Sequence, residues 1–187
     1  SMMGPKPHVV YERPDLDSKI SKVIVFPTTD FNGKVSESAK NINLSIISGW
    51  GGVYGADKTI PAGVLIEKVA SGLGKDSYTK FIKTLDNVSG IEQLVSNPNF
   101  KKLVTDVTDK LGNYQFALAI ISGGEAEYNA GQPVYLHLGL FDTKNLTWRL
   151  ITKIETKKTA VGNWKVASQV MVANSFEVFK KTNNKSE

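Results

Sequence analysis

Metal-ligating and nucleophilic side chains are scarce in this sequence. It contains two histidines and no cysteine among its 187 residues. The lack of cysteine excludes thiol catalysis, disulfides and thiolate metal ligands. His8 lies in a proline-rich stretch, and His137 alternates with leucines on a predicted strand, on the face opposite to them. No partner at metal-ligand spacing accompanies either histidine, so we predict no metal site and no cofactor.

Two pairs of carboxylates have the close spacing that acid–base catalysis requires. Glu125 and Glu127 would share one face of a strand, and Asp106 and Asp109 one side of a helix. Such pairs are far more often solvated surface charge than catalytic dyads. Ser122 precedes two glycines but lacks the Gly-x-Ser-x-Gly elbow of a hydrolase. We therefore predict that the chain is not an enzyme.

Two glycine-rich stretches remain as candidates. Residues 72–77, GLGKDS, lack the first glycine and the hydroxyl residue of a phosphate-binding loop. Residues 44–55, LSIISGWGGVYG, contain four glycines, which oppose a helix. We predict a loop there that presents Trp50, Val53 and Tyr54 to a protein partner, because exposed aromatic residues anchor interfaces. The alternative, in which both rings pack back onto the sheet, is equally compatible with the sequence.

The bulk composition is that of a globular protein. Its hydrophobic content of 41% and charged content of 22% are ordinary values, and its length fits one domain. The net charge is +5, but lysine occurs in short runs spread along the chain. Phosphate binding needs clustered charge, so we do not expect nucleic-acid binding. No apolar run approaches the roughly 20 residues that cross a bilayer.

Apolar patterning predicts strands from both halves of the chain. Residues 20–27 form a short β-branched run that ends at proline, and residues 116–121 form another continuous apolar run. Residues 134–140 and 148–155 alternate with a period of two around a polar turn, which is typical of an antiparallel hairpin with one buried face. Residues 122–127 are expected to extend the strand before this hairpin.

Helical periodicity predicts the remaining elements. The clearest helix runs from Asn97 to Gly112, with a capping residue, an early proline and a closing glycine. Others are expected over residues 61–72, 77–85 and 164–181. The order strand, helices, strand favours a parallel crossover. We predict an α/β sandwich, with a mixed sheet of about four to five strands flanked by three to four helices.

The expected domain organisation is simple. Residues 1–19, with three prolines, several charges and little apolar content, predict a flexible tether. Residues 20–181 form a single α/β domain, and residues 182–187 a polar tail.

Two of these stretches resemble a known group of bacterial envelope proteins. Residues 21–27, SKVIVFP, with 30–33, DFNG, are similar to the opening strand and turn of LpoB-like activators of penicillin-binding proteins and CsgG-like curli-secretion proteins. Residues 138–148, LGLFDTKNLTW, are similar to their late hairpin. The resemblance implies a non-catalytic periplasmic domain that binds an envelope protein as a regulator or assembly factor. It also implies a lipid anchor in the outer membrane, outside this sequence, and no catalytic residues.

A second hypothesis stays open beside this one. The chain could be a small-ligand-binding protein or a hydrolase-type enzyme whose polar groups converge only in three dimensions. A deep pocket that unites Glu125, Tyr135 and His137 would favour it.

Overall fold

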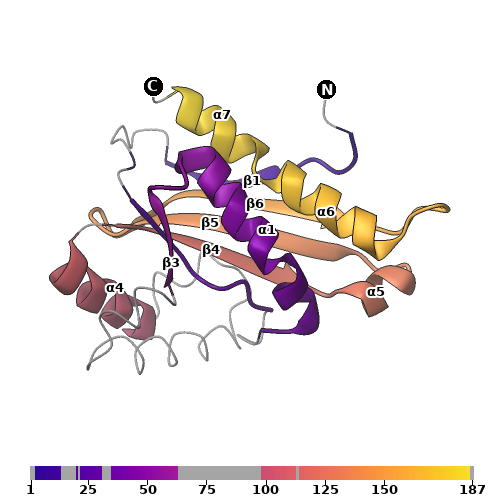
Figure 1. Ribbon diagram of the computed structural model, residues 1–187, viewed down its shortest axis with the longest axis horizontal. Coiled ribbons are helices and arrows are strands. Elements are labelled where there is room, and N and C mark those ends of the chain that lie inside the picture. Colours follow the sequence, from indigo (N-terminus) through magenta and orange to yellow (C-terminus); the bar gives the residue numbers. More distant parts are fainter. Residues whose placement is uncertain are drawn as a thin grey trace.

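The central element of the computed structural model is one mixed sheet of six strands (Figure 1). The structure describes residues 3–13, 20, 22–30, 35–62, 98–112 and 114–185. The strand order is β1-β6-β5-β4-β2-β3. The strands are β1 His8–Glu12, β2 Val23–Val25, β3 Thr59–Pro61, β4 Gln115–Ser122, β5 Val134–Asp142 and β6 Thr147–Thr156. The predicted α/β fold is thus confirmed, with a slightly larger sheet than expected.

Helices α1 and α6 pack against this sheet, and three further helices are described. The five helices are α1 Glu37–Tyr54, α4 Pro98–Leu111, α5 Glu125–Asn129, α6 Trp164–Ser175 and α7 Glu177–Lys185. Helices α1, α6 and α7 form one layer across the sheet, whereas α4 lies apart from them (Figure 1). The predicted helix that ends at Gly112 is confirmed as α4. The helices expected over residues 61–72 and 77–85 lie outside the described residues.

The strands predicted from the early, middle and late parts of the chain do lie in one sheet. Strand β2 pairs in parallel with β4, at Val23↔Gln115 through Val25↔Ala117, which confirms the predicted parallel arrangement. Strand β4 pairs antiparallel with β5, and β5 with β6. Strand β4 therefore separates the early strand from the late hairpin.

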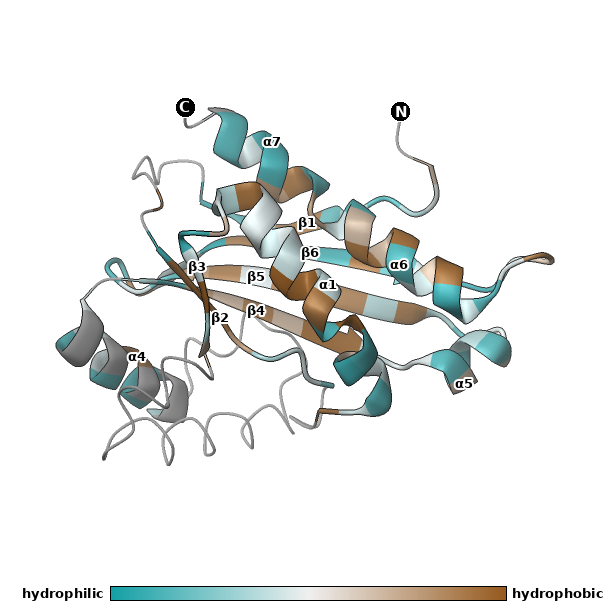
Figure 2. Ribbon diagram, in the orientation of Figure 1, coloured by the Kyte–Doolittle hydropathy of each residue, from teal (hydrophilic) through white to brown (hydrophobic). Residues whose placement is uncertain are grey.

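The hairpin has more buried surface than its alternation predicts. Residues alternate between buried and half-buried from Val134 to Leu138, but the last part of β5 is buried on both faces. There Phe141 packs edge-on against Trp148, with ring centroids 5.2 Å apart, on the face opposite to the leucines. A bulge between Leu140 and Phe141 accompanies the change. Figure 2 shows hydrophobic residues along the strands beneath the helical layer.

The segment 44–55 is the clearest correction to the sequence prediction. It is no loop but the C-terminal two-thirds of α1, an 18-residue helix. Ser36 caps the helix by accepting a hydrogen bond from the Ala39 amide at 3.2 Å. Gly55, at φ +103°, ends it and donates to the Gly51 carbonyl. The glycines weaken intrinsic helix propensity, but packing against the core overrides that preference.

The predicted tether is also wrong in part. Residues His8–Glu12 form the edge strand β1, antiparallel to β6, with a register shift between Val9 and Tyr11. The backbone hydrogen bonds of this strand come from its pairing with β6, which the charged, proline-flanked sequence does not predict.

Two further boundaries differ from expectation. Strand β4 ends at Ser122 because Gly123, at φ +91°, turns the chain into the short helix α5, so residues 122–127 do not extend the strand. The predicted helix over residues 164–181 is two helices, with Phe176 between them. Helix α7 continues to Lys185, so the expected polar tail is largely helical.

Candidate functional sites

The three predicted anchor residues lie in the core rather than on the surface. Trp50 is fully buried, and Val53 and Tyr54 are at most 9% exposed. The Trp50 ring stacks on Tyr54 with centroids 6.2 Å apart and meets Phe176 and Phe179 edge-on at 5.0 and 4.8 Å. The sequence left the exposed and the inward-packed arrangements equally open, and the structure shows the inward-packed one. These side chains cannot anchor a partner from this position.

Glycine is what lets Trp50 approach the C-terminal helices. A Cβ at Gly49 would overlap the Phe176 ring, so only glycine permits this contact. At the end of α1, the Asn183 amide donates to the Val53 carbonyl at 2.9 Å and ties α7 to the helix. The glycine-rich, aromatic sequence therefore indicates close helix packing and not a mobile binding loop.

Burial also changes the chemistry of the Tyr54 phenol. Burial raises the pKa of Tyr54 well above its usual range, and the nearby Arg149 guanidinium opposes the shift only in part. The phenol is neutral at any physiological pH. It acts as a packed aromatic ring and not as an acid or base.

What residues 44–55 do expose is one wall of a groove between α1 and α6. The groove has a volume of about 430 Å³. Leu44 lines it and is 77% exposed, and on the α6 side the lining consists of Ala173, which is exposed, and of Val172 and Phe176, which are at most 3% exposed. Ser48 and Lys180 add polar groups at its lining. An exposed leucine beside an apolar groove is a feature of protein-contacting surfaces.

A second, polar cleft lies at the carboxyl ends of the parallel strands β2 and β4. It has a volume of about 350 Å³ and is lined by Asp30, Ser36, Ser38, Ile121, Ser122, Gly123, Gly124 and Glu127. Ser38 lies so close to Gly124 that any Cβ there would collide with its hydroxyl. Glu127 accepts a hydrogen bond from the Gly124 amide at 3.0 Å. Ligands of open α/β sheets bind at this end of parallel strands.

The residues that the enzyme hypothesis needed do not line this cleft. Tyr135 and His137 are half-buried on one face of β5, and Glu125 is exposed at the start of α5. The Tyr135 ring instead carries the Lys153 ammonium 4.3 Å from its centroid. Glu125 and Glu127 belong to a helix rather than to one strand face.

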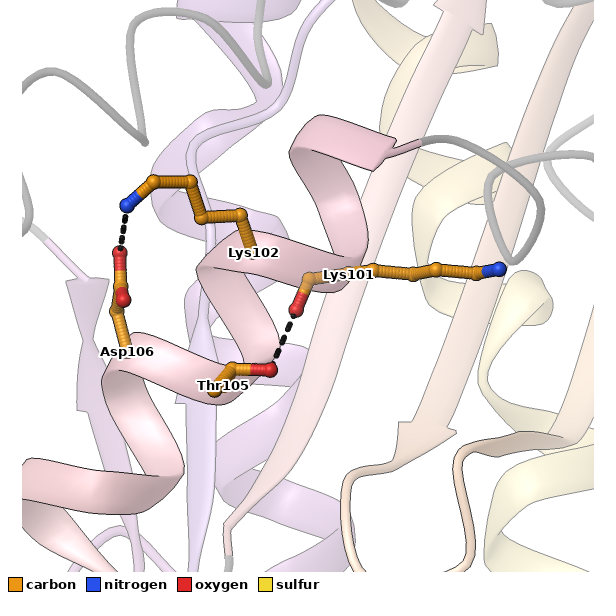
Figure 3. A network of polar contacts seen from close by, with 4 residues as sticks. All are labelled: Lys101, Lys102, Thr105 and Asp106. Atoms are coloured by element: carbon orange, nitrogen blue, oxygen red, sulfur yellow. Dashed lines mark hydrogen bonds and ion pairs between the residues drawn. The ribbon is translucent and has the colours of Figure 1, made fainter.

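Of the two carboxylates Asp106 and Asp109 on α4, Asp106 takes part in an ordinary surface ion pair. Asp106 forms an ion pair with Lys102, one turn earlier, at 3.1 Å (Figure 3). Thr105 likewise donates to the Lys101 carbonyl at 3.0 Å. Exposed i,i+4 pairs of this kind contribute only about 0.3–0.5 kcal/mol. No group of three or more histidine, aspartate or glutamate side chains is placed to hold a metal ion in the described ranges.

The strongest polar network supports the hairpin turn. The Asp142 carboxylate accepts hydrogen bonds from the Lys144 amide, the Asn145 amide and side chain, and the Gln115 side chain, at 2.6–3.4 Å. Burial alone would raise the pKa of Asp142, but these donors together lower it below its usual value. Every partner is local or on the adjacent strand, so this carboxylate holds the turn in place.

Comparison with known proteins shows the fold alone. No family model matches the chain, and no curated protein is similar to it. Solved structures similar to this chain include the PelC dodecamer from Paraburkholderia phytofirmans and the L103M variant of that dodecamer. The first has 6% sequence identity and a TM-score of 0.53, and the match covers 95% of this chain and 98% of PelC. The second has 5% identity with the same TM-score, and the match covers 95% and 99% of the two chains.

At this level of identity, the match shows that the described residues share the fold of PelC and nothing more. Among the described residues, no helix combines the length and the apolar character needed to cross a membrane.

Proposed function

We propose that this chain is a non-catalytic domain that binds another protein of the bacterial cell envelope. On this proposal it works in the periplasm, held at the outer membrane by a lipid anchor outside the present sequence. The sequence resemblance to LpoB-like and CsgG-like proteins supports the compartment. The sheet that contains both resembling stretches, β2 and the β5–β6 hairpin, is consistent with that resemblance.

The observation that carries a binding role is the groove between α1 and α6. Leu44 is more exposed than nearly every other large apolar residue described. It stands across the groove from Ala173, which is exposed, and above Val172 and Phe176, which are at most 3% exposed and form the floor of the groove. A partner that inserted an apolar side chain there would cover Leu44 and bury surface at about 25 cal/mol per Å². On this proposal the contact is made by Leu44 on the outward face of α1, and not by Trp50, Val53 and Tyr54, which are buried.

The similar fold of PelC suggests a second possible occupant of the groove, which an experiment must distinguish from an envelope protein. PelC is a dodecamer, so a second copy of this chain is an alternative to a different envelope protein. Light scattering on the purified chain distinguishes the two. A monomer at micromolar concentration leaves the groove for another protein.

The decisive experiment compares two charge substitutions. Leu44→Asp places a carboxylate at the groove, whereas Val35→Asp alters an exposed valine ahead of the helix, 56% accessible. Chemical cross-linking in the bacterial periplasm, followed by titration of the purified partner, measures the effect. We expect Leu44→Asp to weaken binding at least tenfold and Val35→Asp to leave it unchanged. Equal binding by both variants would remove the groove from the proposal.

The polar cleft favours a second candidate, a small-ligand-binding protein. Its two carboxylates, Asp30 and Glu127, and its serines suit a polar ligand rich in hydroxyl groups or a cation. Thermal unfolding in the presence of such ligands, with Glu127→Gln as the comparison, tests this. A ligand that stabilises the native chain and not the variant would favour the second candidate over the first.

A further inference from the structure

The loop that joins β6 to α6 borders an apolar cleft with unusually exposed valines. The cleft, about 450 Å³ in volume, is lined by Val161, Val166 and Val170, and by Gly4 and Pro5 of the N-terminal segment. Val161 is 95% exposed and Val166 is 55% exposed. The loop protrudes beyond the end of the sheet, and Figure 2 shows hydrophobic colour at its tip. Exposed apolar side chains that gather beside one cleft are a feature of surfaces that contact another protein or a membrane.

The loop is held in this position by packing. The Gly162 amide donates to the Thr159 carbonyl at 3.2 Å, which closes a turn with Val161 at its tip. A Cβ at Gly162 would collide with the Tyr128 hydroxyl, and the Tyr128 ring in turn packs on Trp164 at 5.6 Å. The valine therefore projects from a supported turn instead of folding back into the cleft.

The N-terminal segment lies against the same region of α6. The Asn174 side-chain amide donates to the carbonyls of Met3 and Pro5, at 2.7 and 2.9 Å. Gly4 packs against Val170, and Met3 is 84% exposed. Residue 3 is thus fixed beside the cleft, and any chain upstream of it would leave from this side of the molecule.

Positive charge surrounds the apolar tip. Lys157, Lys158 and Lys165 are exposed, and none of them has an ion-pair partner among the described side chains. The N-terminus of α6 adds its partial positive charge, with no acidic residue in its first turn. Glu155, which lines the cleft, is the one acidic residue among residues 155–166, all of which the structure describes. With its three lysines, this stretch therefore has a net charge of +2.

We propose that this surface, the loop face formed by Lys157, Lys158, Val161, Lys165 and Val166, docks onto an anionic phospholipid bilayer. Apolar side chains that enter the interface, with basic side chains at headgroup level, are how peripheral proteins contact membranes. The inference rests on the proposed function for the presence of a membrane. There a lipid anchor upstream of residue 3 would emerge beside the loop face and hold it against the bilayer.

Vesicle flotation with the unanchored chain tests the inference. We expect the chain to float with vesicles of phosphatidylglycerol and phosphatidylcholine and not with pure phosphatidylcholine. A lysine near an anionic surface contributes about fivefold in partitioning. The double variant Lys157→Glu, Lys158→Glu should therefore lower binding by at least about 25-fold. Val161→Asp should lower it several-fold, because a carboxylate would enter the interface.

The matched controls change the same charges elsewhere. Lys101→Glu with Lys102→Glu on α4 gives the same change in net charge (Figure 3) and should retain vesicle binding. Leu44→Asp on α1 is the matched control for Val161→Asp and should also retain vesicle binding. Equal loss in both lysine pairs, binding independent of lipid charge, or no binding by the native chain would each overturn the docking surface.

The two proposals fail separately. The Lys157→Glu, Lys158→Glu variant leaves the groove between α1 and α6 untouched, so it should still bind its protein partner. Leu44→Asp should lose the partner and keep the vesicles. Thermal unfolding close to that of the native chain in every variant shows that each loss is local; the control on α4 should lose only the small stability of the Lys102–Asp106 ion pair.

Discussion

Residues 44–55 and residues 8–12 both form regular elements, of which the first packs into the core and the second stays exposed, although both were predicted to be irregular. The first segment, rich in glycine and aromatic rings, was expected to be an exposed loop and forms the buried end of α1. The second, inside a proline-flanked charged stretch, was expected to be a tether and forms strand β1, with Val9, Val10 and Tyr11 all more than a third exposed. Apolar residues alone therefore do not say which side of a segment is covered. The element that packs on it decides.

The largest expected effect tests the buried member of this comparison. Trp50→Ala should destabilise the protein by about 3–5 kcal/mol, because it empties the space between Tyr54, Phe176 and Phe179. Urea unfolding followed by circular dichroism measures it. Leu44→Ala, on the exposed side of the same helix, should stay within about 0.5 kcal/mol of the native value. A Trp50→Ala variant as stable as the native chain would contradict the burial of Trp50 and favour the predicted exposed loop.

Alanine substitutions at two glycines of α1 should change the stability of the protein in opposite directions, depending on whether the glycine is packed or exposed. Gly49→Ala should destabilise by about 1–3 kcal/mol, because its Cβ would overlap the Phe176 ring. Gly52 is exposed with open space around it, so Gly52→Ala should stabilise by up to about 1 kcal/mol through better helix propensity. Thermal unfolding of the two variants gives the comparison. A loop over residues 44–55 would show no such difference in sign.

The pH dependence of Tyr54 gives a smaller effect. Burial raises its pKa in the folded state, so its contribution to stability is complete below about pH 10, the usual tyrosine value, and is lost as the pH rises above it. The loss should reach about 1 kcal/mol at about pH 11 relative to Tyr54→Phe, whose buried ring cannot ionise. Urea unfolding of both proteins at about pH 8 and pH 11 measures the difference. Parallel pH profiles would place the phenol in water.

The smallest expected effect is that of a substitution on the exposed strand β1. Val10→Ala on β1 should change the free energy of unfolding by less than about 0.5 kcal/mol, because this side chain is already 46% exposed. Hydrogen exchange of the β1 amides is the more sensitive measurement and should show protection through the β6 ladder. Rapid exchange throughout residues 8–12 would favour the tether.

Short-range patterns predicted the elements whose cause is local. The period of two on either side of residues 141–147 indicated the hairpin, and a capping residue, a proline and a glycine bounded α4. The turn at Ser122 was missed although Gly123 and Gly124 were visible, because glycine indicates a bend but does not specify the element after it. The break at Phe176 left no local sign, and the contacts of its ring, with Gly49 and Trp50, are far away in the chain.

The candidate surfaces depended still more on tertiary structure. Leu44 is more than 100 residues away from Val172 and Phe176, and they meet only because α1 and α6 lie side by side on the sheet. The loop face is different, because Lys157, Lys158 and Val161 are close in sequence and only their exposure awaited the fold. Sequence reasoning named Trp50, Val53 and Tyr54 instead, since aromatic residues near glycine look alike in a binding loop and in a close helix contact.

The sequence by itself determined the α/β class, the late hairpin, the parallel pairing of an early and a middle strand, and the absence of thiol chemistry. These depend on side-chain periodicity and residue types, which act over a few residues or need no structure at all. The tertiary structure decided which apolar residues are covered, where the sheet has its edges and which helices form a groove. Burial is a property of pairs of distant segments, and no single stretch of chain contains it.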